Sequence, residues 1–213
     1  MTDGETTLRT GLKQLQLELN DKQITQLLAY QTLIAKWTKV YNLTAVRDPA
    51  EMMTHHLLDS LAVIAPLQRQ MHQGSVLDVG SGAGLPGAVI AICCPAVSVT
   101  CVDAVAKKAT FIKQVALELT LPNLAGLHAR VENINQKYDV ICSRAFASLS
   151  DFTSWSANAL APAGVWLAMK GKYPTDELAA LPPGIDVFHV EQLHVPGLGA
   201  ERCVVWLRQK SVS

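Results

Sequence analysis

From residue 75 onward, short apolar runs alternate with helical patterns, and this alternation constrains the fold more than any other feature. The runs at residues 75–79, 97–102, 127–131, 138–143 and 165–169 have the length and composition of buried strands. Strands that alternate with helices form βαβ units and a mainly parallel sheet. Two final runs, at 188–195 and 203–208, lie close together along the chain and predict an antiparallel pair at the sheet edge. The expected fold class is therefore α/β, with a doubly wound, mainly parallel sheet of seven strands.

The first 70 residues show helical periodicity instead and predict an N-terminal helical cap. One apolar stripe contains Leu8, Leu12, Leu15 and Leu19, and a second contains Ile24, Leu27, Leu28, Ile34, Trp37 and Tyr41. A third helix is expected to begin with Asp48 as N-cap, Pro49 at the first helical position and Glu51 at the capping-box position, and to end at Pro66. We expect residues 1–70 to form the cap and residues 71–213 the α/β core of one integrated domain.

Composition narrows the class of protein. Hydrophobic residues make up 49% and charged residues 17% of the chain, as in a globular protein. No apolar run reaches the roughly 18 residues of a membrane span, and the N-terminus has no signal-peptide pattern. These features predict a soluble protein of the cytoplasm.

The cysteines and histidines do not predict a metal site. The five cysteines form no C-x-x-C pair, their number is odd, and most lie in apolar runs, so we expect reduced core residues. His55 and His56 are adjacent on a predicted helix and point about 100° apart, which is unfavourable for binding one ion.

The net charge is zero, so composition as a whole does not indicate a nucleic-acid-binding protein. One local stretch does favour such a partner, because Lys36, Lys39 and Arg47 occur there without an acid. Trp37 and Tyr41 in the same stretch fit a core stripe better than a base-stacking surface.

The strongest motif is the glycine-rich segment at residues 76–87, which joins the first predicted strand to a helix. Gly80, Gly82 and Gly84 allow a sharp turn and close approach of a ligand to the backbone, at the edge where open α/β sheets bind ligands. A literal G-x-G-x-x-G from Gly82 to Gly87 keeps an NAD-binding interpretation open. However, in the frame that starts at Gly80 the third glycine position holds Leu85. Asp78 would also repel a pyrophosphate, whereas it suits the sulfonium and amino groups of S-adenosylmethionine.

Asp103 ends the second predicted strand, 103 − 84 = 19 residues after Gly84. That is about where a ribose-binding carboxylate lies in nucleoside-cofactor folds. Asp103 therefore supports a nucleoside cofactor without choosing between NAD and S-adenosylmethionine.

Several blocks in a fixed order carry a family resemblance. They are Tyr41-Asn42-Leu43-Thr44-Ala45, His56-Leu57-Leu58-Asp59-Ser60, the segment Leu77 to Gly87, Val102-Asp103 with Lys107, Lys108 and Phe111, then Ser143-Arg144-Ala145, and Lys170-Gly171. With these blocks, the chain resembles the RsmG (GidB) family of bacterial 16S rRNA guanine-N7 methyltransferases, from about residue 20 to about 208. Ala104 is a small departure, since relatives often have Ser there.

The resemblance implies a class I methyltransferase fold, S-adenosylmethionine as cofactor, and as partner the 30S ribosomal subunit, through a guanine in the 530 loop of 16S rRNA. It further implies that Gly80 and Leu85 line the amino-acid and ribose side of the cofactor. Val131 and Glu132 would flank the adenine, and Arg144 would lie in the binding crevice.

Guanine N7 has a lone pair and no proton at neutral pH, so its methylation needs no general base. On the family resemblance, Arg144 and Lys170 are the candidate catalytic residues, which would hydrogen-bond guanine O6 or a phosphate and fix the base. Two other functions stay open: a methyltransferase of a small molecule or protein, and a nucleotide-binding ribosome-assembly factor without catalysis. A monomer is expected, and the form of the RNA substrate stays open.

Overall fold

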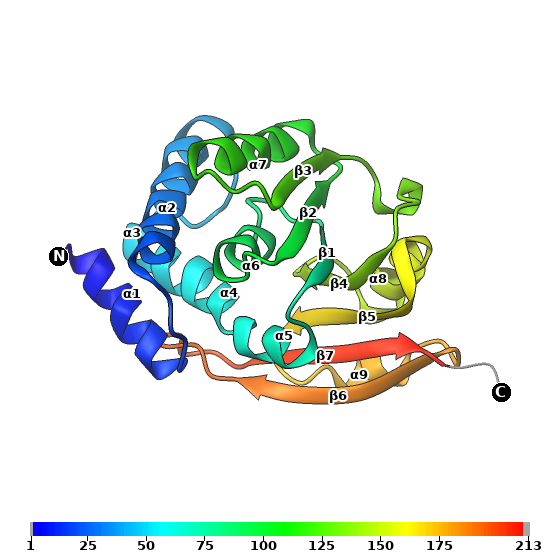
Figure 1. Ribbon diagram of the computed structural model, residues 1–213. Coiled ribbons are helices and arrows are strands. Elements are labelled where there is room, and N and C mark those ends of the chain that lie inside the picture. The colour runs from blue at the N-terminus through cyan, green and yellow to red at the C-terminus, as the bar shows by residue number, and fades with distance from the viewer. Residues whose placement is uncertain (1, 211–213) are drawn as a thin grey trace.

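The computed structural model describes residues 2–210 and arranges them around one mixed sheet (Figure 1). Within these residues the sheet has seven strands in the order β3-β2-β1-β4-β5-β7-β6. The strands are β1 (Gly74–Val79), β2 (Val97–Asp103), β3 (Leu124–His128), β4 (Tyr138–Arg144), β5 (Leu160–Lys170), β6 (Ile185–Leu193) and β7 (Arg202–Gln209). The strands β1 to β5 pair in parallel, and β7 pairs antiparallel with both β5 and β6. The predicted α/β class and the closing antiparallel pair are confirmed.

Helices cover the sheet on both faces, which makes the central strands apolar on both sides. Neighbouring residues point to opposite faces, so Val76 joins one apolar cluster while Leu77 joins the other. The cap and first core helices are α1 (Asp3–Gln14), α2 (Asp21–Tyr41), α3 (Pro49–Met52), η1 (Met53–Leu58), α4 (Asp59–Leu61), α5 (Ile64–Gln70), α6 (Gly87–Cys93) and α7 (Ala106–Glu118). The remaining helices are η2 (Val131–Asn133), α8 (Leu149–Ser156), η3 (Ala157–Ala159) and α9 (Thr175–Ala179).

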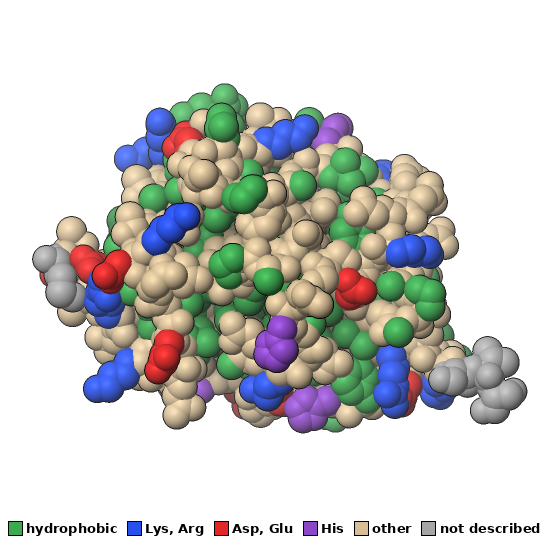
Figure 2. Space-filling view, viewed as in Figure 1, with side chains coloured by type: hydrophobic (Ala, Val, Ile, Leu, Met, Phe, Trp, Pro, Cys, Tyr) green, Lys and Arg blue, Asp and Glu red, His purple; other side chains and the backbone are tan. Residues whose placement is uncertain are grey.

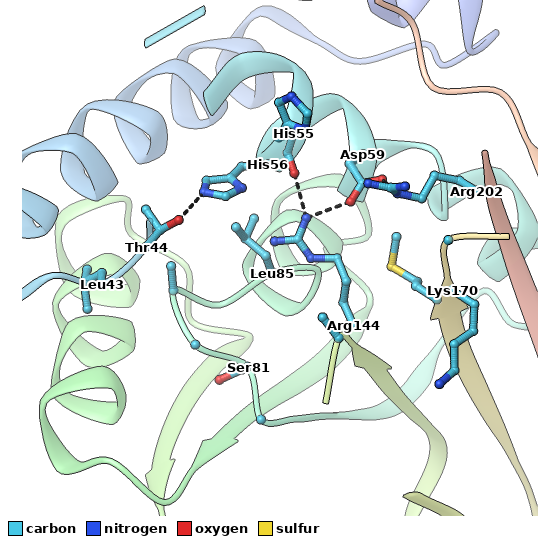
Figure 3. A pocket seen from close by; sticks show the side chains of 16 residues that line it. Leu43, Thr44, His55, His56, Asp59, Ser81, Leu85, Arg144, Lys170 and Arg202 are labelled. Atoms are coloured by element: carbon cyan, nitrogen blue, oxygen red, sulfur yellow. Dashed lines mark hydrogen bonds and ion pairs between the residues drawn. The ribbon is translucent and has the colours of Figure 1, made fainter. Parts of the chain in front are cut away.

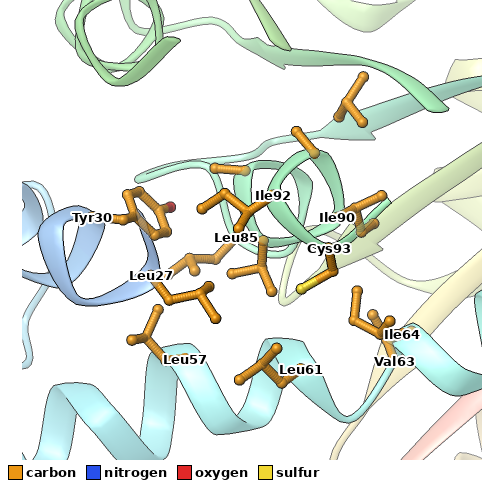
Figure 4. Packing of buried hydrophobic residues seen from close by; sticks show 14 of the residues in the cluster. Leu27, Tyr30, Leu57, Leu61, Val63, Ile64, Leu85, Ile90, Ile92 and Cys93 are labelled. Atoms are coloured by element: carbon orange, nitrogen blue, oxygen red, sulfur yellow. The ribbon is translucent and has the colours of Figure 1, made fainter. Parts of the chain in front are cut away.

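The cap helices share one hydrophobic core with the sheet. Figure 4 shows Leu27 and Tyr30 of α2, together with Leu57 and Leu61, packed against the α6 region, and all four side chains are fully buried. Side-chain caps begin two of the cap helices, and the predicted cap at Asp48 is one of them. Asn20 forms a reciprocal capping box at α2, and Asp48 accepts hydrogen bonds from two backbone N–H groups at the start of α3.

The expected single helix between Pro49 and Pro66 is wrong in two respects. Its middle is a π-helix, η1, and the chain turns at residues 62–63 before α5 begins. Pro66 then lies in the first turn of α5, where a missing N–H costs no intrahelical hydrogen bond, so the helix continues to Gln70.

The third strand lies earlier than predicted, at Leu124–His128 instead of 127–131. Gly126 explains the shift, since a Cβ at this position would meet the Ala109 carbonyl and Ile112 of α7. Glycine thus allows α7 to pack closely on a strand that apolar periodicity alone does not reveal. Val131 falls instead in the 3-10 helix η2.

The predicted core stripe on α2 is only partly correct. Trp37 packs against Phe111 with ring centroids 5.2 Å apart, but Tyr41 is 43% exposed at the helix end. All five cysteines are buried, which confirms that they are core residues. No helix in residues 2–210 has both the length and the apolar character needed to cross a membrane.

Candidate active site

The glycine loop lies between β1 and α6, at the carboxyl edge of the sheet. Gly80, Gly82 and Gly84 have φ angles of 63°, 58° and 88°, which side-chain-bearing residues rarely adopt. A Cβ at Gly80 would also collide with the Phe146 ring, and one at Gly84 with Ile112. The loop conformation therefore requires glycine at both positions.

Two buried side chains, Asp78 and Tyr30, form hydrogen bonds that hold this loop in place. Asp78 is fully buried, and its Oδ2 accepts a hydrogen bond of 2.8 Å from the Gly87 N–H at the start of α6. Burial raises the pKa of the Asp78 carboxyl to about 7. The Tyr30 hydroxyl bonds the carbonyl oxygens of Ala83 and Gly84. Asp78 does not line either of the two surface hollows beside the loop, so its direct contact with a cofactor stays a prediction.

A small hollow of about 150 Å³ lies beside the end of β2. It is lined by residues that the sequence places on a nucleoside, namely Asp103, Val131 and Glu132, and Gly80 borders it. Asp103 Oδ2 accepts a 3.0 Å hydrogen bond from the Gly82 N–H, so this carboxylate joins the second strand to the glycine loop. The structure thus brings the predicted adenosine-side residues together.

A larger hollow of about 440 Å³ is also bordered by Gly80, and Figure 3 shows the side chains that line it. The glycine loop, including Gly82 and Leu85, forms one wall of this hollow. The opposite wall carries polar side chains from the cap, β4, β5 and β7: Thr44, His55, His56, Asp59, Arg144, Lys170 and Arg202. The cap therefore contributes directly to the site.

Arg144 and Arg202 are held by one carboxylate of the cap. Arg144 Nη1 donates to Asp59 Oδ2 at 2.7 Å and to the His55 carbonyl at 2.8 Å. Arg202 Nε donates to Asp59 Oδ1 at 2.8 Å. Asp59 is 2% exposed, so these are charge-assisted bonds in a nearly dry environment. We call this group of three side chains the basic wall.

Lys170 lines the same hollow but has other partners. Its Nζ donates to Glu177 Oε2 at 2.7 Å and to the Ala147 carbonyl at 3.0 Å. In Figure 3 its ammonium group points away from Arg144 and Asp59. The catalytic role predicted for Lys170 therefore stays a prediction.

His56 lines the same hollow and is held by a hydrogen bond within the cap. Thr44 Oγ1 shares a hydrogen bond of 2.8 Å with His56 Nε2 and also accepts one from the Val46 N–H. Burial lowers the pKa of His56, so the imidazole is uncharged near neutral pH.

Among the residues at the site, Tyr30, Asp59, Phe146 and Arg202 carry no role predicted from the sequence. Tyr30 lies on an ordinary apolar helix face, and Arg202 stands in no motif. Asp59 belongs to one of the blocks that carry the family resemblance, but its spacing from other polar residues does not indicate a binding site. Phe146 directly follows Ser143-Arg144-Ala145 and is the one of the four that the sequence motifs point to most clearly. Among residues 2–210 no cluster of three or more His, Cys, Asp or Glu side chains is arranged for a metal ion.

Solved structures resemble the chain in fold. TrmN from Thermus thermophilus aligns with a TM-score of 0.58 at 19% identity, covering 74% of this chain and 53% of that one. A SAM-dependent methyltransferase from Aquifex aeolicus aligns with a TM-score of 0.55 at 19% identity, covering 75% and 93%. At such identities the likeness establishes the fold alone, which is the predicted class I methyltransferase fold.

Relatives in sequence are much closer. The ribosomal RNA small subunit methyltransferase G of Polaromonas sp. (strain JS666) is 71% identical over all of this chain and 97% of its own length. The protein of that name from Polaromonas naphthalenivorans is 72% identical over 96% of each chain. The profile of the family described as rRNA small subunit methyltransferase G matches residues 23–205. The resemblance inferred from the short blocks is confirmed, and the chain belongs to the rRNA small subunit methyltransferase G (GidB) family of S-adenosylmethionine-dependent methyltransferases.

Proposed function

We propose that this enzyme transfers a methyl group from S-adenosylmethionine to N7 of a guanine in the 530 loop of 16S rRNA, free or within the 30S subunit. The observation that carries the proposal is full-length identity of 71% to a protein named for small-subunit rRNA methylation. The site supports it, because a glycine loop and a basic wall face each other across one hollow.

The two hollows fit the parts of the cofactor. Gly80 borders both, which provides a continuous path along the glycine loop. Asp103, Val131 and Glu132 would hold the adenosine, while Gly80, Gly82, Gly84 and Leu85 would hold the amino-acid part, with Asp78 beneath them. When bound, S-adenosylmethionine supplies a methyl group on a positively charged sulfur.

The protein's contribution to the chemistry is orientation. Guanine N7 carries no proton, so no residue has to remove one. The two side chains of the hollow that could act as a base already have partners. Asp59 is hydrogen-bonded to two arginines, and His56 is hydrogen-bonded to Thr44. Arg144 would hold the base or its phosphate so that N7 faces the methyl group, an effect that accounts for large rate factors.

The surface around the hollow suits RNA in one place. Leu43 and Thr44 line the hollow, and the flanking Lys39, Tyr41 and Arg47 are exposed. Elsewhere, Lys and Arg are dispersed among acids and apolar side chains on the face seen in Figure 2, in keeping with zero net charge. RNA contact is therefore proposed at the rim of the hollow, with the protein acting as a cytoplasmic monomer.

Methyl transfer to purified substrates tests the proposal. The enzyme is incubated with labelled S-adenosylmethionine and either 30S particles or free 16S rRNA, and the product is mapped by mass spectrometry. We expect one N7-methylguanine in the 530 loop. Cofactor binding without any methyl group on 16S rRNA would refute the substrate assignment.

A further inference from the structure

Asp59 joins two arginines that belong to different strands. Arg144 ends β4 and Arg202 begins β7, and β5 lies between these strands in the sheet. Each carboxylate oxygen of Asp59 accepts one guanidinium hydrogen bond, at 2.7 and 2.8 Å. The carboxylate comes from the cap, directly after the π-helix η1. Such π-turns often occur at functional sites.

Both arginines keep hydrogen-bond donors for a further ligand. Within residues 2–210, Arg144 uses only Nη1, and Arg202 uses Nε and Nη1. The Nε and Nη2 groups of Arg144 and the Nη2 group of Arg202 have no partner there. The two side chains line the larger hollow and are 20% and 24% exposed.

The charge of this group favours one bound anion. Two guanidinium groups in proximity repel each other, and the carboxylate between them offsets one of the two charges. The basic wall therefore carries a net charge of +1, and the planar guanidinium forks match phosphate oxygens. Lys170 does not add to this charge, because Glu177 neutralises it.

We propose that Asp59 is a positioning residue that holds Arg144 and Arg202 as a clamp for one phosphate of the RNA substrate, beside the reacting base. The inference rests on the proposed function only in taking RNA as the substrate. The other anion available is the carboxylate of the cofactor. A phosphate is favoured because Arg202 lies on the far side of Asp59 from the glycine loop (Figure 3).

The RNA affinity of the Asp59→Asn variant tests the clamp, because the clamp and general electrostatics predict changes in opposite directions. The substitution removes a negative charge, so general electrostatics predicts tighter RNA binding. The clamp predicts weaker binding, because an amide cannot accept from both guanidinium groups. Asp186→Asn is the matched control, since it makes the same charge change at the distant Arg208–Asp186 ion pair. We expect the Kd for a 16S rRNA fragment with the 530 loop to rise about 10-fold in Asp59→Asn and to stay level or fall in the control.

Salt dependence provides a readout that loss of structure alone would not move in this way. Each lost phosphate contact lowers the slope of log Kd against log salt concentration by about 0.7 for single-stranded RNA. We expect that decrease in Asp59→Asn and an unchanged slope in Asp186→Asn. The Kd for S-adenosylmethionine should change less than about 2-fold in both variants.

Arg202→Lys decides the question if Asp59→Asn does not fold, as judged by circular dichroism and cofactor binding. Lysine keeps the positive charge, but its single nitrogen lacks the planar fork by which a guanidinium presents separate nitrogens to Asp59 and to a phosphate. We expect its RNA Kd to rise about 10-fold with cofactor affinity retained.

Three results would overturn the clamp: RNA affinity unchanged in a folded Asp59→Asn or Arg202→Lys variant, a loss of cofactor affinity without a loss of RNA affinity, or a wild-type protein that binds no RNA. A wild-type protein that binds the fragment but methylates no 16S rRNA would refute the proposed function and leave the binding test of the clamp valid.

Discussion

The two walls of the larger hollow are built in different ways. The glycine loop comes from one short segment, and its shape depends on backbone conformation that only glycine adopts easily. The basic wall combines Asp59, Arg144 and Arg202 from three distant segments, which the cap and sheet bring together. A cofactor that many enzymes share can be held by a local motif, whereas the wall that we propose for the substrate depends on the particular fold of this chain.

Removing a guanidinium from the basic wall should have the largest effect. Arg144→Ala leaves Asp59 with one arginine and removes a donor from the hollow. We expect kcat to fall about 100-fold or more, because a misplaced base loses the in-line geometry, while the Kd for S-adenosylmethionine changes much less. Single-turnover methyl transfer with 30S particles measures it. A variant that loses cofactor affinity and keeps its turnover would reverse the roles assigned to the two walls.

The carboxylate beneath the glycine loop should make stability depend on pH. Because the folded-state pKa of Asp78 is raised from 3.8 to about 7, the folded state retains its proton where the unfolded chain has lost it. The stability contributed by that proton is present below pH 4 and is lost as pH rises to about 7.

Asp78→Asn should remove this loss. Between pH 5 and pH 8 the free energy of unfolding should fall less in Asp78→Asn than in the wild type, by on the order of 3 kcal/mol. Urea unfolding at the two pH values measures this difference. Equal decreases in both proteins would mean that Asp78 is not responsible for the pH dependence of the free energy of unfolding.

A side chain at the first loop glycine should weaken cofactor binding. Gly80→Ala places a methyl group against Phe146 and strains a backbone with φ of 63°. We expect the Kd for S-adenosylmethionine to rise about 10- to 100-fold by calorimetry. Gly184→Ala is the control, since no atom lies within 4 Å of its added Cβ. Normal cofactor affinity in Gly80→Ala would show that the loop does not bind the cofactor.

The smallest effect is expected where the cap supports the loop. Tyr30→Phe removes the hydroxyl that bonds the carbonyl oxygens of Ala83 and Gly84. We expect a loss of about 1–3 kcal/mol of stability and about a 5-fold weaker cofactor affinity. Tyr41→Phe, at an exposed position, serves as the control. Identical behaviour of the two variants would show that the loop does not need this contact.

The same contrast explains which features could be predicted from the sequence. Strands buried on both faces are continuous apolar runs, and Gly80 to Leu85 follow one of them directly, so the sheet and the loop were predictable. Short elements that depend on tertiary packing were not predictable. Gly126 interrupts the apolar pattern of β3, and the π-helix has no sequence pattern of its own. Arg202 was missed because only the fold brings it to Asp59, 143 residues away.

A crystal structure with bound S-adenosylhomocysteine tests the division between the two walls most directly. We expect the adenosine beside Asp103 and Glu132 and the amino-acid part along Gly80 to Leu85, with Arg144 and Arg202 still joined through Asp59 and their remaining donors free. A cofactor carboxylate seated between Arg144 and Arg202 would contradict this division.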